Sequence, residues 1–268
     1  MRRFLCALAV AASGLAAVPA SAGIGDLLVA PTRVILNGGR GTEIILKNVG
    51  EGTATYRISA ELRRMSPDGK LIEVTEPNAL EKAAQDMIVF APRKVTLPPN
   101  QPQAIRVSAH APAGLADGEY RVHLLFRAIP DPKPVSDPKA STGLAFQLIP
   151  IYGVTIPVIV RLGNLTAKAG IADVHPVGKP GADAVSLQLS RLGQRSMYGE
   201  IRVIKAGVKD PIAMTKGVAL YPEITGRTIV VPRAKDYAGP LSGPVTVQFF
   251  ENSDTGPILA AETSAVLR

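Results

Sequence analysis

Hydrophobic and β-branched residues occur along this chain in short runs, broken about every 8–12 residues by Gly, Pro, Asn or Asp, which is the pattern of an all-β sandwich. Helical periodicity is nearly absent. A single short helix is predicted over Asn78–Asp86, where a capping Asn precedes Ala, Leu, Glu and Lys. The clearest strand runs of the first half are Leu27–Leu36, Thr42–Asn48, Thr55–Leu62, Leu71–Thr75, Ala104–Ala109 and Glu119–Ile129.

A change of composition divides the chain into two halves. Residues 130–142 hold four prolines with Asp and Lys between them, so this stretch predicts an exposed loop. A long stretch of low charge follows, and we place a linker at about residues 161–165. The first domain is then 23–161 and the second 165–268, long enough for two sandwiches of similar architecture. The strand runs of the second are Ala184–Ser190, Glu200–Lys205, Val218–Tyr221, Thr228–Val231, Val245–Phe250 and Ile258–Val266.

Residues 1–22 are typical of a cleavable secretory signal peptide. Two arginines are followed by a short apolar run and by Ala20-Ser21-Ala22, a small-x-small cleavage site. The apolar run is shorter than the roughly 20 residues of a membrane-spanning helix, so we expect export without membrane insertion. The one cysteine, Cys6, lies in this segment, and the mature protein is expected to hold neither thiol nor disulfide.

The formal net charge of +8 is compatible with an acidic partner. Nucleic acid is a poor candidate, because the chain is expected to be exported, only 4% of its residues are aromatic, and its basic residues are not interleaved with aromatic ones. Two interpretations stay open: an ordinary solvated basic surface, or a basic cleft for a partner that carries a carboxylate.

Motifs for catalysis, metals and phosphate are missing from the sequence. His110, His123 and His175 are far apart and follow no metal-binding spacing, so we expect neither a metal nor another cofactor. The Gly-rich segment 37–42 lacks the Gly-Lys-Ser/Thr ending of a phosphate loop and is interpreted as a hairpin turn. No Gly-x-Ser-x-Gly elbow occurs. The sequence therefore favours a protein that is not an enzyme.

In the stretch Leu144–Tyr152 both the odd and the even positions are mostly apolar, so both faces of a strand would be apolar. Leu144, Phe146 and Leu148 would lie on one of these faces. Such a strand is either buried on both faces in its own sandwich, or packs its own core on one face and a partner on the other. The long polar loop before it favours the second interpretation, because an apolar edge strand is tolerated where adding a strand to another chain is the function.

The sequence resembles the periplasmic pilus (fimbrial) chaperones. The resemblance covers nearly all of the first domain; in the second it is thin and rests mainly on Phe249–Asp254. The motifs that carry it are Leu28–Ile35, Lys47–Gly50, Phe90–Asn100 with Gln103–Val107, and Glu119–Arg121 leading to Ala128–Pro130.

This resemblance implies two immunoglobulin-like sandwiches in an L-shaped arrangement. It implies a periplasmic chaperone that stabilises pilus or fimbrial subunits by donating a β-strand and hands them to an outer-membrane usher. The donated apolar side chains correspond to Leu144, Phe146, Leu148 and Pro150. The alternative with the same fold is a secreted immunoglobulin-like structural or adhesive module.

The resemblance also implies a binding site at the domain junction. Arg33 corresponds to the arginine that holds the subunit's C-terminal carboxylate. The family's second anchor is a lysine, but Thr155 stands at its position here, and no lysine occurs between Lys139 and Lys168. The residues that match the family's interdomain charge network are Glu119, Arg161 and Asp254.

Overall fold

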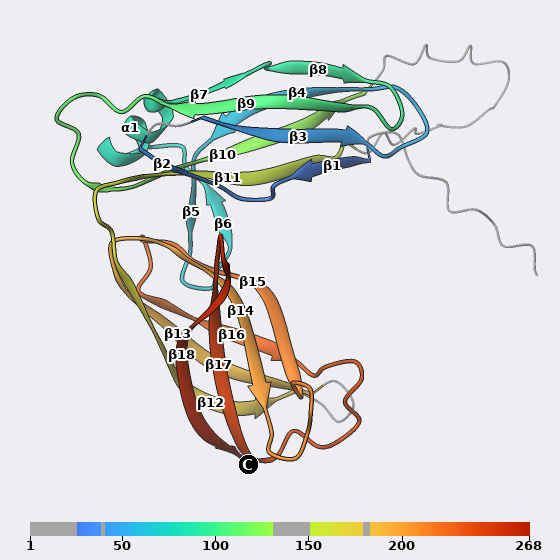
Figure 1. Ribbon diagram of the computed structural model, residues 1–268, viewed down its shortest axis with the longest axis vertical. Helices are drawn as coiled ribbons and strands as arrows, with labels where there is room; N and C mark the ends of the chain where they lie inside the picture. The colour runs from blue at the N-terminus through green and yellow to red at the C-terminus, as the bar shows by residue number, and fades with distance from the viewer. Residues whose placement is uncertain (1–25, 39–40, 131–150, 179–182) are drawn as a thin grey trace, which may run out of the picture.

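The structure is a computed structural model that describes residues 26–38, 41–130, 151–178 and 183–268. It consists of strands and one short helix, α1, and its two sandwiches lie at an angle to each other (Figure 1). Strands of the first run across the view, and those of the second run down it, so the molecule is L-shaped. The all-β prediction with two domains in an L is confirmed.

The first domain has the strand order of an immunoglobulin-like sandwich. Tyr120, near the start of β10, donates its hydroxyl to the carbonyl of Ala116 at 2.7 Å, the tyrosine corner of this fold. One sheet has the order β1 (Leu27–Ala30), β3 (Thr42–Asn48), β9 (Pro102–Ala109), β7 (Ile88–Ala91). The other has the order β2 (Val34–Asn37), β11 (Gly153–Leu162), β10 (Gly118–Ile129), β4 (Ala54–Glu61), β8 (Lys94–Leu97).

The second domain is a smaller sandwich of seven described strands with its own core, in which Phe249 and Ile201 are fully buried. One sheet has the order β12 (Ala167–Val177), β13 (Ala184–Gly193), β16 (Gly226–Pro232). The facing sheet has the order β15 (Ala213–Leu220), β14 (Met197–Ile204), β17 (Gly243–Ser253), β18 (Gly256–Leu267). Between the domains, β11 ends at Leu162 and β12 begins at Ala167.

Helix α1 (Ala79–Met87) confirms the predicted helix, with its boundaries shifted by one residue. Asn78 caps it, and Glu81 returns a hydrogen bond to the backbone of Asn78, which completes a capping box. Before the helix, β5 (Arg63–Met65) and β6 (Leu71–Glu73) form a hairpin that reaches from the first domain to the second (Figure 1). No helix of the described part of the chain is long and apolar enough to cross a membrane.

Two predictions about the start of the first domain are wrong. The run Leu27–Leu36 is not one strand, because the chain leaves the first sheet after Ala30 and enters the second at Val34. Pro31 lies in the break, where it has no N–H group to contribute to a ladder. Segment 37–42 is not a hairpin turn, because β2 pairs with β11 and β3 pairs with β1 and β9, in the opposite sheet.

Candidate functional site

Within the described residues, about half of β11 has a neighbouring strand on one side only. Along its whole length β11 pairs with β10 on one side, but on the other side β2 pairs only with Val158–Arg161. Among the described residues, Gly153–Pro157 have no strand on that side, and we refer to this segment as the open edge of β11. Arg33 directly precedes β2 and therefore lies where the open edge ends.

The outward face of β11 points to the second domain. Ile156, Val158 and Val160 face the core of their own sandwich. Ile159, of the opposite parity, is buried in a cluster with four residues of the hairpin and the second domain: Met65, Ala219, Tyr221 and Ile224. An apolar contact thus joins the sheet that carries the open edge to the second domain.

Ser196, between β13 and β14, is held by three charged side chains of the first domain. Glu119 Oε2 accepts from the Ser196 backbone N–H at 2.9 Å and from Arg161 Nε at 3.0 Å. Arg161 Nη2 donates to the Ser196 carbonyl at 3.2 Å, and Arg33 Nη2 donates to its hydroxyl at 2.8 Å. Because the Glu119 carboxylate is 1% exposed and Ser196 is fully buried, this network fixes one end of the domain junction.

Arg33 lies between two tyrosines of the second domain. Its guanidinium carbon is 5.0 Å from the ring centroid of Tyr198 and 5.4 Å from that of Tyr221. Its Nη1 donates to the Tyr221 hydroxyl at 3.2 Å, while its Nε is buried and has no hydrogen-bond partner in the described structure. The described partners of Arg33 are neutral hydroxyls and aromatic rings.

The β5–β6 hairpin and β10 hold the second domain at the other end of the junction. Glu223 Oε1 accepts from the Met65 backbone N–H at 2.7 Å and from Arg121 Nη2 at 2.6 Å. The Arg121 guanidinium lies 3.6 Å from the ring centroid of Tyr221. Arg227 Nη1 donates to the carbonyl of Gly69, at the turn of the hairpin, at 3.2 Å.

His123 is buried at this junction, edge-on to Tyr221 with 6.3 Å between ring centroids. Burial, together with the positive charges of Arg121, Arg63 and Arg33, lowers the pKa of His123 to about 3. The imidazole is therefore neutral at physiological pH. The described residues contain no cluster of three His, Cys, Asp or Glu side chains that could hold a metal ion.

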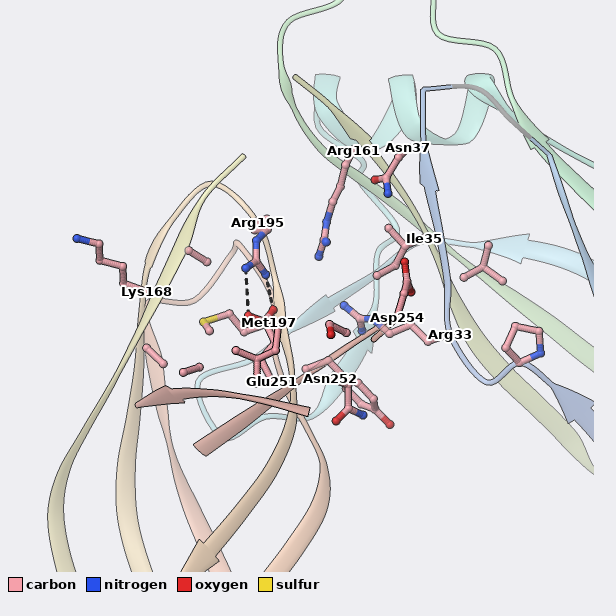
Figure 2. A pocket seen from close by; sticks show the side chains of 18 of the residues that line it. Arg33, Ile35, Asn37, Arg161, Lys168, Arg195, Met197, Glu251, Asn252 and Asp254 are labelled. Atoms are coloured by element: carbon pink, nitrogen blue, oxygen red, sulfur yellow. Dashed lines mark hydrogen bonds and ion pairs between the residues drawn. The ribbon is translucent and has the colours of Figure 1, made fainter. Parts of the chain in front are cut away.

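Among the clefts that the described residues form at the junction, two are lined by Arg33. The larger, of about 930 Å³, is shown in Figure 2 and carries both signs of charge. Arg195 and Glu251 form an ion pair in its wall, and Lys168 and Asp254 lie on its lining. The smaller cleft, of about 300 Å³, lies between the hairpin, β11 and the second domain. Arg33 lines both.

The structure brings three of the residues singled out from the sequence together: Arg33, Glu119 and Arg161. Asp254 is exposed in the turn between β17 and β18 and forms no ion pair within the described structure. Thr155 lies on β11 opposite Leu125, half-buried, and lines neither cleft. Leu144, Phe146, Leu148 and Pro150 lie outside the described residues.

Sequence reasoning missed Ser196, Tyr221 and Glu223 as junction residues. The available signal was on β10, where Glu119, Arg121 and His123 are spaced two apart in an otherwise apolar strand. That spacing places three polar side chains on one face, which indicates a second covered surface. It does not identify the residues that cover it.

Comparisons with known proteins give structural neighbours alone. No protein-family model matches the sequence, and no curated protein matches it significantly. The structure is similar to that of the YadV chaperone, with 14% identity, a TM-score of 0.48, and coverage of 90% of this chain and 100% of that one. The E. coli chaperone DraB is 16% identical over 92% of this chain and 98% of its own, with a TM-score of 0.47.

A third similar structure is the complex of Salmonella enterica SafA pilin with the SafB chaperone. Its matching chain is 16% identical, covers 90% of this chain and 96% of its own, and gives a TM-score of 0.46. Other matching structures include the class 5 fimbriae chaperone CfaA and the periplasmic chaperone SfaE.

Proposed function

We propose that this protein is an exported periplasmic chaperone that binds pilus or fimbrial subunits by lending them a β-strand, and that it passes them to an outer-membrane usher. The observation that carries the proposal is the open edge of Gly153–Pro157, which ends at Arg33 in the domain junction. A sandwich that lacks a strand could pair with this edge and complete its own sheet.

The apolar residues before β11 extend this edge in sequence. Ile151 and Tyr152, directly before the strand, are 48% and 56% exposed, so their apolar surface is accessible to a partner. In the proposal Leu144, Phe146, Leu148 and Pro150 enter the groove of the subunit. Burial of each such side chain contributes about 1.5–3 kcal/mol before the costs of binding.

Arg33 supplies register in this mechanism. A charge-assisted hydrogen bond from its guanidinium to the subunit's C-terminal carboxylate is worth about 1.5–3 kcal/mol. The hydroxyls of Tyr221 and Ser196, its present partners, are neutral, so a carboxylate is a stronger acceptor than either. Fixing the chain end matters because a shift of one residue would turn every donated side chain away from the groove.

This mechanism needs no covalent step, since one β-strand is exchanged for another. We therefore propose a protein that is not an enzyme and uses no cofactor. Both domains take part, because the first provides the open edge and the second provides the tyrosines and Ser196 that hold Arg33 at the end of that edge.

The test is co-expression with candidate pilus subunits, followed by co-purification. We expect wild type to retain a bound subunit, whereas Arg33→Ala and Leu148→Asp release it. Leu192→Asp is the matched control, because Leu192 is 76% exposed and lies on the second domain away from the open edge. Equal retention by all four proteins would refute the proposed site, and failure of wild type to bind any subunit would favour the structural or adhesive module.

A further inference from the structure

Two arginines from different domains line the smaller cleft of the junction. Arg33 reaches it from the first domain and Arg227, on β16, from the second. Tyr198 and Tyr221 also line it, and the described lining of this cleft contains no Asp or Glu. The charged side chains of the described lining are therefore both positive.

Neither arginine has its charge compensated in the described structure. The Nε atoms of Arg33 and Arg227 are both buried without a hydrogen-bond partner, and neither side chain forms an ion pair. Arg227 donates only to a neutral carbonyl, that of Gly69. Burial lowers the pKa of Arg227, and the Tyr221 side chain opposes this effect in part.

A guanidinium group that is largely removed from water is ordinarily paired with an anion, because an isolated charge is costly to desolvate. Arg33 and Arg227 are each partly buried. In the larger cleft, Arg195 pairs with Glu251. The described lining of the smaller cleft holds no such pair, and its volume of about 300 Å³ leaves room for a ligand group. An anion bound there would compensate the charges of both arginines.

The open edge of β11 leads to this cleft. Pro157, the last residue of β11 without a β2 partner, lies in the wall of the cleft beside Arg33. A strand added to the open edge and ending at this point would bring its terminal carboxylate between the two arginines. Planar guanidinium groups match the geometry of a carboxylate, which can accept hydrogen bonds at both of its oxygens.

We propose that Arg227, together with Arg33, binds the C-terminal carboxylate of the bound subunit in the smaller cleft. This inference rests on the proposed function and assigns the second cation of the anchor to the second domain, whereas the first-domain strand carries Thr155 at the corresponding position. One ligand group is then held by both domains, so binding also stabilises their relative orientation.

The experiment uses a synthetic peptide with the last residues of a subunit that co-purifies, prepared both as the free acid and as the C-terminal amide. Calorimetry compares the two affinities for the mature protein. Wild type should prefer the free acid by about tenfold to a hundredfold, the equivalent of one or more charge-assisted hydrogen bonds. Arg227→Gln should lose most of this preference, and Arg227→Lys should retain part of it.

Lys168→Gln is the matched control, because it removes the same charge from the larger cleft and should keep the full preference. Loss of the preference in Lys168→Gln but not in Arg227→Gln would overturn the assignment, since the larger cleft would then hold the carboxylate. Full preference in Arg227→Gln overturns this inference and leaves the proposed function standing. If wild type binds neither peptide and no subunit, both fail. The Arg227→Lys variant keeps the charge, so it decides the question should Arg227→Gln not fold.

Discussion

Replacing Glu119 with alanine should weaken the contact between the two domains more than any change of an exposed charge. The Glu119 carboxylate is 1% exposed and accepts hydrogen bonds from the buried N–H of Ser196 and from Arg161, whose side chain is 19% exposed. Its loss leaves a buried N–H and a largely buried guanidinium without their partner. A broken buried ion pair costs about 3–5 kcal/mol, and the partial exposure of Arg161 places the expected loss near 3 kcal/mol.

The assay is urea unfolding followed by tyrosine fluorescence and circular dichroism, because the chain has no tryptophan and Tyr198 and Tyr221 lie at the junction. Glu43→Ala is the control. Glu43 also pairs with an arginine, Arg106, at 3.4 Å, but the two side chains are 53% and 85% exposed, and we expect a loss of roughly 0–1 kcal/mol. Equal losses in the two variants would show that the Glu119 network does not stabilise the junction.

Two further predictions concern buried polar side chains. The pKa of His123 is about 3 in the folded protein and 6.5 in the unfolded chain, so the stability that depends on neutral His123 is fully present above pH 6.5 and is lost as the pH falls toward 3. Between pH 7 and pH 5 the free energy of unfolding should therefore fall by about 2 kcal/mol. Unfolding curves at both pH values should show that His123→Leu abolishes this pH dependence, whereas His110→Leu, at an exposed position, leaves it unchanged. Asn48→Ala should cost about 3 kcal/mol by chemical denaturation, because the Asn48 side chain binds three backbone groups in the fully buried interior. Asn78→Ala, which removes the helix cap, should cost only about 1 kcal/mol; a reversed order would contradict both assignments.

Sequence patterns predicted the sandwiches because most strands bury one face, and that face is visible as alternation. Two of the strands that were not among the predicted runs have weak patterns: β12 is half-exposed along most of its length, and β5 begins with two arginines. The break at Pro31 was missed for another reason. The apolar residues on both sides of it are buried in the same core, so the run is continuous in hydrophobicity although the chain changes sheets.

The junction was predictable only in part, because half of its hydrogen bonds end on backbone groups. Ser196 is bound through its backbone N–H and carbonyl. Nearly every residue has both groups, so the sequence does not indicate which residue makes these contacts. Arg33 and Glu119 were identified because they match charged positions of the family that the sequence resembles. Arg227 could not be identified from the sequence. An arginine on an edge strand is common, and only the structure shows that this one lines the cleft at the junction.

Because the hairpin β5–β6 contacts the second domain, the covalent connection between the domains does not have to fix the angle between them. The second domain is hydrogen-bonded to the hairpin through Glu223 and to β10 and β11 through Ser196. Neither set of hydrogen bonds involves residues 163–166. This short segment is therefore a tether and not a hinge. Inserting a residue or two into it should be tolerated with the angle between the domains unchanged, whereas shortening the hairpin would let the second domain swing.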